Sequence, residues 1–240
     1  MRTSNLTVKG AHYMKIFVYE NYKKMSQAAA QLIAAQLMEK PCSHIGLTAG
    51  KTPVGLYQEL IELYQNGQHI FADAWYYNLE EVIGHSSDSA ESYCTVLREM
   101  LLNHVGVASN RMPMPNGLSE DPAMECVRFD HYLDNLPSSG LDIQVLGLGT
   151  DGHIGCNRPG DTLSAASHVV SLSRGRTGMA MGMSSIMKSK CLLMLANGEE
   201  KAQAVADMCY GPISTHCPST FLQLHPNTLV LLDQAAASRL

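Results

Sequence analysis

The sequence predicts an α/β fold in one domain: a doubly wound, mostly parallel sheet of the Rossmann-like three-layer type. Short apolar segments alternate with longer segments of helical period, as expected for a parallel sheet covered by helices. A chain of 240 residues is long enough to bury one large core. Internal repeats and long linkers are absent, so we expect a single domain at residues 14–240 behind an N-terminal tail at residues 1–13.

The first third of the chain begins with a predicted strand at residues 15–20, KIFVYE, which is rich in aromatic and β-branched side chains. Residues 25–40 are predicted to form a helix, because apolar side chains recur three and four positions apart until a proline. A strand at residues 44–49 and a helix at residues 52–67 follow, the helix with a proline in its first turn. Residues 74–79, AWYYNL, form the next predicted strand.

The middle of the chain contains two predicted helices, residues 89–106 and 121–136, both of helical period. Residues 142–149, DIQVLGLG, form a mostly apolar segment typical of a buried strand, and residues 168–172, HVVSL, form another predicted strand.

The last third contains a predicted strand at residues 191–196, a helix at residues 198–211 and a strand at residues 228–233. In a doubly wound sheet, ligands bind at the carboxyl ends of the strands, where loops lead into helices. The polar and glycine-rich residues that follow each strand are therefore the candidates for a functional site.

Composition limits the classes of function. The 17 basic and 22 acidic residues leave a net charge of −5, which argues against nucleic acid or a membrane as partner and favours a small soluble substrate. No signal peptide and no apolar segment of roughly 18 residues is found. Seven cysteines without a CxxC pair indicate reduced thiols, mostly in the core, and a cytoplasmic protein. Histidines and cysteines at ligand spacing are absent, so we expect no metal and no cofactor.

Two loops suit an anion and a proton transfer. Gly50, Lys51 and Thr52 lie at a strand-to-helix turn, where free backbone N–H groups and a lysine would bind a phosphate. Their spacing is not that of a Walker A loop, and an ordinary capped turn is equally consistent. Glu80 and Glu81 end an apolar strand, where burial would raise the pKa of a general base. A solvated strand end is the alternative.

A third loop, GLGTDGHIGCNRPG, follows the strand at residues 142–149. Its glycines allow close approach of a ligand. His153 could donate or accept a proton near neutral pH, and Asp151 would set the charge around it. Further along, Arg174, Arg176 and Lys201 could reach an anionic ligand, although solvated surface charge is the ordinary interpretation for each.

Six segments together resemble the glucosamine-6-phosphate deaminase/isomerase family, which shares its superfamily with the 6-phosphogluconolactonases. The segments, in order, are LTAGKTPVGLYQEL, YNLEEVIG, AESY, VLGLGTDGHIGCNRPG, NGEEKAQAV and LQLHP, and they cover nearly the whole chain. Within this family the chain is most similar to galactosamine-6-phosphate isomerase-like members. The resemblance implies a cytoplasmic enzyme of carbohydrate metabolism that opens an amino-sugar 6-phosphate, moves a proton from C2 to C1 and releases ammonia.

The resemblance also implies roles for individual residues. Glu80 lies where the family has its proton-shuttling aspartate, and Asp151 with His153 matches the ring-opening Asp-Gly-His. The implied phosphate site consists of Gly50, Lys51, Thr52 and Lys201, with either Arg174 or Arg176 as its arginine.

Two departures from the family pattern raise the question of substrate choice. Glu80 is one methylene longer than the usual aspartate, which would displace the carboxylate by about an ångström. Arg158 occupies the position of a glutamate that pairs with the catalytic histidine, and a cation there would disfavour the protonated form of His153. Arg158 and Glu81 are therefore candidate specificity residues.

Three functions stay open at this point. The first is a deaminase or isomerase with an altered substrate, and the second is a lactonase, in which His153 would be the base on water. Against the lactonase, the chain reads LEEV and IGCN where lactonases are expected to have Asp-Glu-Arg and Thr-Ala-Ser. The third is a non-catalytic sugar-phosphate-binding protein. A homo-oligomer is also left open.

Overall fold

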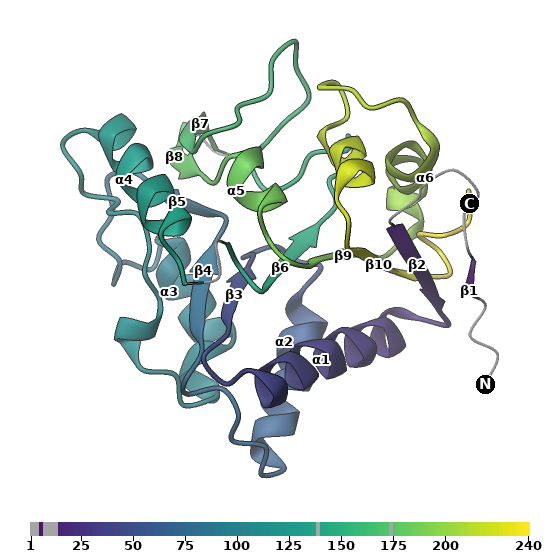
Figure 1. Ribbon diagram of the computed structural model, residues 1–240, viewed down its shortest axis with the longest axis horizontal. Helices are drawn as coiled ribbons and strands as arrows, with labels where there is room; N and C mark the ends of the chain where they lie inside the picture. Colours follow the sequence, from purple (N-terminus) through teal and green to yellow (C-terminus); the bar gives the residue numbers. More distant parts are fainter. Residues whose placement is uncertain (1–4, 7–13, 138–139, 173–174) are drawn as a thin grey trace.

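A seven-stranded sheet forms the centre of the protein (Figure 1). The computed structural model describes residues 5–6, 14–137, 140–172 and 175–240. The strand order is β1-β2-β10-β9-β6-β3-β4, with β1 antiparallel and all other neighbours parallel. The strands are β1 (Asn5–Leu6), β2 (Met14–Tyr19), β3 (His44–Leu47), β4 (Trp75–Asn78), β6 (Ile143–Gly147), β9 (Leu192–Ala196) and β10 (Thr228–Asp233). The predicted α/β sheet is confirmed.

Helices cover both faces of this sheet. In Figure 1, α1 and α2 lie on one side and α5 and α6 on the other. Side chains of the central strands alternate between the two cores, so that Val145 packs with the first set of helices and Leu146 with the second. The helices are α1 (Tyr22–Glu39), α2 (Val54–Gln65), α3 (Tyr93–Met100), α4 (Pro122–Asp134), α5 (Met183–Met187) and α6 (Ala202–Tyr210), with short 3₁₀ segments η1 (Leu102–His104), η2 (Ser109–Arg111), η4 (Glu199–Lys201) and η5 (Pro218–Leu224).

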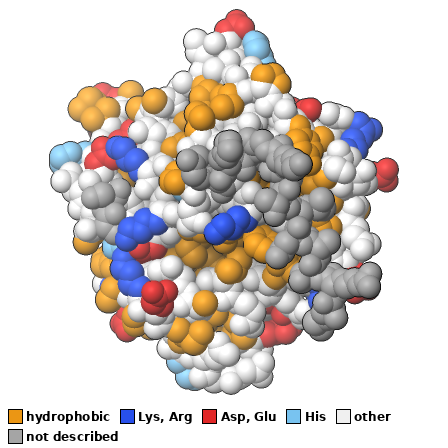
Figure 2. Space-filling model, turned by 45° about the vertical axis from the view of Figure 1, so that its right-hand side comes forward, with side chains coloured by type: hydrophobic (Ala, Val, Ile, Leu, Met, Phe, Trp, Pro, Cys, Tyr) orange, Lys and Arg blue, Asp and Glu red, His pale blue; other side chains and the backbone are white. Residues whose placement is uncertain are grey.

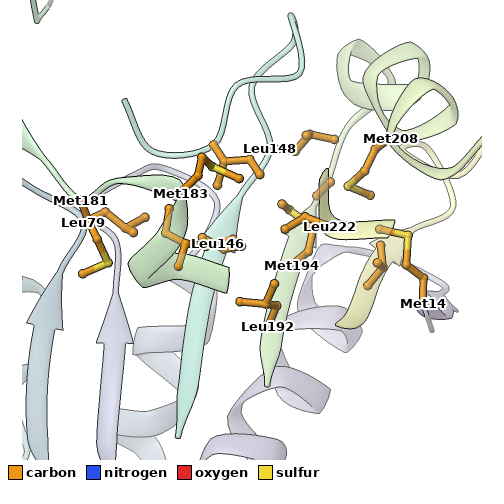
Figure 3. Close-up of a cluster of buried hydrophobic side chains, with 14 of the residues drawn as sticks. Met14, Leu79, Leu146, Leu148, Met181, Met183, Leu192, Met194, Met208 and Leu222 are labelled. Carbon is orange, nitrogen blue, oxygen red and sulfur yellow. The ribbon is translucent and has the colours of Figure 1, made fainter. Parts of the chain in front are cut away.

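The core beneath α6 is rich in methionine (Figure 3). Met14, Met194 and Met208 pack with leucines of neighbouring strands, and all three are buried. The unbranched thioether chain adapts to gaps of irregular shape, which suits a core between a twisted sheet and short helices.

A second, three-stranded antiparallel sheet consists of β5 (Glu80–Val82), β8 (Thr177–Ala180) and β7 (His168–Ser171), in that order. The strand predicted at residues 168–172 therefore exists, but it does not belong to the parallel sheet. Its side chains alternate between half-buried and exposed, whereas the central strands are buried on both faces. The short strands β5 and β8 and the helix α5 were not among the predicted elements.

Most predicted elements of the main sheet and its helices lie within a few residues of the observed ones. The helix predicted at residues 89–106 is shorter, because α3 ends at Met100 and a 3₁₀ turn follows. Within the predicted tail, Asn5–Leu6 pairs with β2 as an edge strand. Among the described residues, no helix has the length and apolarity needed to cross a bilayer. Acidic and basic side chains lie interspersed on the face shown in Figure 2.

Candidate active site

A cavity of about 720 Å³ opens at the carboxyl ends of four adjacent parallel strands, β9, β6, β3 and β4. The loops that follow these strands supply its lining, as expected for a doubly wound sheet. Six of the predicted site residues line it: Gly50, Lys51, Thr52, Glu80, His153 and Lys201. The fold thus brings together residues that are up to 151 positions apart in the sequence.

Glu80 begins β5, directly after the short connection from β4. The buried Asn78 shapes this connection, because its side chain accepts a hydrogen bond from the Leu79 N–H at 2.9 Å and donates to the Glu80 carbonyl at 2.8 Å. Burial raises the pKa of the Glu80 carboxyl, and the nearby cations oppose this only in part. Glu80 is therefore a carboxylate suited to accept a proton at the cavity wall.

The thiol of Cys156 donates a hydrogen bond to Glu80 Oε2 over 2.6 Å. Cys156 is buried and packs with Val82, Leu172 and Ala180. From the sequence, this cysteine was expected only as a small core residue, and its contact with the carboxylate was not predicted.

His153 and Asp151 form a tight polar pair in the loop after β6. Asp151 Oδ1 lies 2.5 Å from His153 Nδ1 and accepts a hydrogen bond from the His153 N–H at 3.2 Å. Burial would raise the pKa of Asp151, but the hydrogen bonds and the charge of His153 outweigh it and lower the pKa. An Nδ1–H donor to Asp151 leaves Nε2 of His153 as the atom for proton exchange.

Two glycines allow this loop to fold so tightly. A Cβ atom at Gly149 would overlap the imidazole ring of His153. Gly152 has a φ of 81°, which glycine adopts without strain. The His153 ring can therefore lie against the backbone that follows β6.

Two lysines also line the cavity. Lys51 is exposed in the turn before α2, and Lys201 ends η4. In the described part of the chain, neither ammonium group has a hydrogen-bonded or ionic partner. The Tyr22 hydroxyl fixes the turn that follows Lys51 by donating to the Thr52 carbonyl at 2.8 Å and accepting from the Gly55 N–H at 2.7 Å. Free amines beside a helix N-terminus suit a phosphate.

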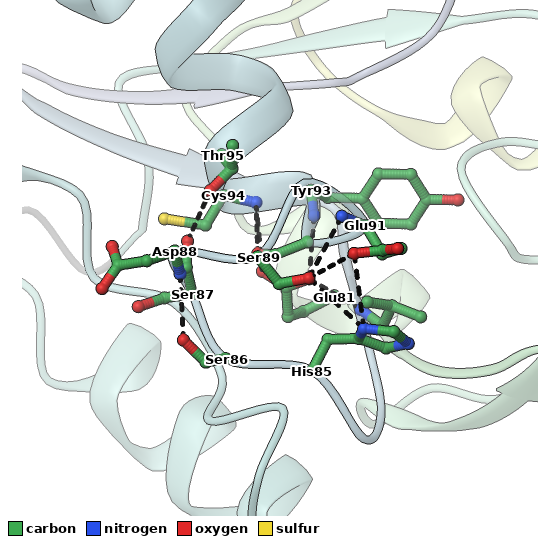
Figure 4. A network of polar contacts seen from close by, with 12 residues as sticks. Glu81, His85, Ser86, Ser87, Asp88, Ser89, Glu91, Tyr93, Cys94 and Thr95 are labelled. Carbon is green, nitrogen blue, oxygen red and sulfur yellow. Dashed lines mark hydrogen bonds and ion pairs between the residues drawn. The ribbon is translucent and has the colours of Figure 1, made fainter.

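Glu81 lies outside the cavity. Its carboxylate accepts hydrogen bonds from Ser92 Oγ and from the N–H groups of Val82, Tyr93 and Cys94 at 2.7–3.1 Å. Figure 4 shows Glu81 beside the first residues of α3. The side chain is 2% exposed, so the geometry favours a structural role and argues against the predicted contact with substrate.

Arg158 and Arg176 do not line the cavity. Arg158 is exposed, and its charge lowers the pKa of Glu80 and of Cys156. Arg176 lies over the Tyr93 ring, 5.9 Å from its centroid. Its predicted role in phosphate binding stays a prediction. Arg174 lies outside the described residues.

Several residues of the site were missed by sequence reasoning, namely Tyr22, Asn78 and Cys156. Of these three, only Asn78 had a signal in the sequence that could have marked it as a site residue, because it is an amide at the end of an apolar strand. Among the described residues, no group of three or more His, Cys, Asp or Glu side chains is arranged to hold a metal ion.

Comparison with known sequences identifies close similarity over nearly the whole chain. Residues 20–231 match the family model described as glucosamine-6-phosphate isomerases/6-phosphogluconolactonase. A glucosamine-6-phosphate deaminase of Clostridioides difficile is 38% identical, covering 95% of this chain and 97% of that protein. One of Thermoanaerobacter pseudethanolicus is 35% identical, with 94% of each covered.

Solved structures show the same fold. A monomeric glucosamine-6-phosphate deaminase superimposes with a TM-score of 0.88 at 35% identity, covering 94% of this chain and 99% of that one. The 6-phosphogluconolactonase of Trypanosoma brucei superimposes with a TM-score of 0.76 at 20% identity, covering 94% of this chain and 98% of that one, a likeness of fold alone.

Proposed function

This chain belongs to the glucosamine-6-phosphate isomerase/6-phosphogluconolactonase family, and from that membership we propose that it is an amino-sugar 6-phosphate deaminase. It converts glucosamine 6-phosphate and water into a ketohexose 6-phosphate and ammonia. The observation that carries the proposal is the cavity lined by Glu80, by two unpaired lysines and by His153, whose Nδ1 is paired with Asp151.

Ring opening is assigned to His153. Opening the pyranose ring requires a proton on the ring oxygen and removal of the C1 hydroxyl proton. An imidazole whose Nδ1 is held by Asp151 presents Nε2 for this exchange. Asp151 is 48% exposed and acts through His153.

Proton transfer from C2 to C1 is assigned to Glu80. One carboxylate within reach of both carbons removes the C2 proton and returns it to C1, which leaves an imine at C2. Water then hydrolyses the imine, so that ammonia leaves and the ketose remains. The raised pKa of Glu80 supports this assignment, because a stronger base accepts a carbon-bound proton more readily.

The phosphate is assigned to Lys51, Lys201 and the turn at Gly50 and Thr52. Binding at this end fixes the sugar so that C1 and C2 reach Glu80. The single-chain cavity and the monomeric relative support a site complete in one subunit, and the homo-oligomer stays a prediction. The seven free cysteines support the proposed cytoplasmic location.

The test is incubation with glucosamine 6-phosphate, galactosamine 6-phosphate, unaminated aldose 6-phosphates and 6-phosphogluconolactone in deuterated water. NMR follows deuterium at C1 and C2, ammonia release and lactone opening. We expect ammonia from an amino-sugar phosphate, and at least a 100-fold loss in Glu80→Gln. Lactone opening without ammonia would favour the hydrolase. Binding without exchange or hydrolysis would favour the non-catalytic protein, and either result would overturn the proposal.

A further inference from the structure

We propose that Cys156 is a positioning residue for Glu80. Its thiol holds one oxygen of the Glu80 carboxylate so that the other oxygen faces the substrate. The inference rests on the proposed function of Glu80 as the base that moves a proton between C2 and C1.

The contact is specific to one oxygen. Cys156 Sγ lies 2.6 Å from Glu80 Oε2, and within the described part of the chain Oε1 accepts no hydrogen bond. Glu80 lines the cavity, whereas Cys156 does not. A glutamate has one more rotatable bond than an aspartate, so a second point of attachment reduces the number of conformations available to its carboxylate.

The thiol itself is held rigidly. Cys156 lies in a turn closed by two hydrogen bonds between the backbones of Ile154 and Asn157, at 3.2 and 3.0 Å. The Asn157 side chain donates to the Met181 carbonyl at 2.9 Å, which ties this turn to the end of β8. Since β8 pairs with β5, the thiol and Glu80 are fixed to one small sheet.

The chemistry of the thiol excludes a role as nucleophile. Burial raises the pKa of Cys156 far above its ordinary value, and the charge of Glu80 raises it further. Only the thiolate is a good nucleophile or is readily oxidised. A thiol that stays protonated is instead a permanent hydrogen-bond donor.

Among the described residues, five ionisable groups interact with the Glu80 carboxylate. Cys156, His153 and Arg158 come from the loop after β6, Glu81 from β5 and Tyr93 from α3. Of the interactions that lower the pKa of Glu80, the hydrogen bond from Cys156 has the largest effect. Loss of this bond should therefore raise the pKa of Glu80, so that the base is protonated at a higher pH.

The kinetic test compares Cys156→Ala, which lacks a donor, with Cys156→Ser, which retains one. We expect kcat/KM of the alanine variant to fall about tenfold at neutral pH and its acidic limb to move to higher pH. The serine variant should restore most of the rate and the wild-type limb. Cys209→Ala removes a buried thiol from α6 and should leave the pH profile unchanged. A wild-type profile for Cys156→Ala, or no rescue by serine, would overturn the proposal.

A second measurement does not depend on turnover. The infrared S–H stretching band that disappears in Cys156→Ala should lie at lower frequency than those of unbonded thiols, and it should rise in Glu80→Ala. A band at the unbonded frequency would contradict the contact even in an inactive protein. Wild-type inactivity toward every amino-sugar phosphate would instead contradict the proposed function.

Discussion

Arg158 acts on two groups that the sequence analysis did not connect with it. Its expected effect on the protonated form of His153, an imidazole that lies 2.5 Å from Asp151, stays a prediction. The charge of Arg158 is felt by Glu80 and Cys156, whose pKa values it lowers. The cation therefore opposes the effect of burial on the proposed base and keeps more of it ionised.

We predict that Arg158→Gln loses activity mainly at low pH. Without the cation, the pKa of Glu80 rises further, so the acidic limb of kcat/KM moves to higher pH. Because Arg158 is exposed, the effect should be about threefold at a pH on that limb, and smaller at high ionic strength. Arg158→Lys is the control that retains the charge. A limb that is unchanged in the glutamine variant would contradict this account.

At the scale of elements, β5 directs its two carboxylates in opposite directions. Successive side chains of a strand point to opposite faces, so Glu80 reaches the cavity while Glu81 reaches the N-terminus of α3. Free N–H groups at a helix start favour a carboxylate there. The same strand thus supplies the proposed base and anchors the neighbouring helix.

Replacing Glu81 by Gln should lower the free energy of unfolding by about 2 kcal/mol. The amide nitrogen of glutamine cannot accept the hydrogen bonds that the second carboxylate oxygen receives. Chemical denaturation with urea measures the effect, and Glu91→Gln on the exposed loop before α3 is the control, with little expected change. Equal stability of the two variants would argue against this anchoring role.

The turn before α2 and η4 form the proposed phosphate end of the site. Lys51→Met and Lys201→Met should each raise KM for a sugar 6-phosphate about tenfold or more, because a charge-assisted hydrogen bond is lost. Inhibition by inorganic phosphate should weaken in parallel. Lys23→Met, on the exposed surface of α1, is the control. An unchanged KM in both site variants would place the phosphate elsewhere.

At the scale of the whole molecule, Asp142 joins elements at the end of the sheet opposite the cavity. It precedes β6, is 4% exposed and accepts hydrogen bonds from Lys40 at 2.7 Å and from the His44 N–H at 2.8 Å. Lys190, before β9, also contacts it at 3.1 Å. Burial would raise the pKa of Asp142, but these partners outweigh it and lower the pKa below its ordinary value.

The contacts of Asp142 make the free energy of unfolding depend on pH. Since the folded pKa of Asp142 lies below the unfolded value of about 3.9, its contribution is full at neutral pH and is lost as pH falls through the folded pKa. The free energy of unfolding of Asp142→Asn should therefore be about 2 kcal/mol lower than that of the wild type at pH 7. The difference should shrink in strong acid. The measurement is thermal unfolding of both proteins from neutral pH to strong acid. A difference in stability that stays constant across these pH values would contradict the argument.

Several features followed from the sequence because local chemistry determines them. Apolar segments such as residues 142–149 and 228–233 became central strands, since continuous burial on both faces requires such composition. The glycines and the Asp-Gly-His of the loop after β6 marked the site, as did Lys51 and Lys201, because ligands bind at the carboxyl ends of parallel strands.

Other features were decided only by the tertiary structure. The sequence could not show that β7 pairs with β8 and β5 outside the main sheet, nor that Cys156 lies against Glu80 from 76 positions away. Without the family resemblance, it also could not separate Glu80 from Glu81, two adjacent carboxylates with opposite surroundings. Composition and periodicity report how well a segment suits burial, whereas partners are fixed by contacts between distant segments that form only when the chain packs.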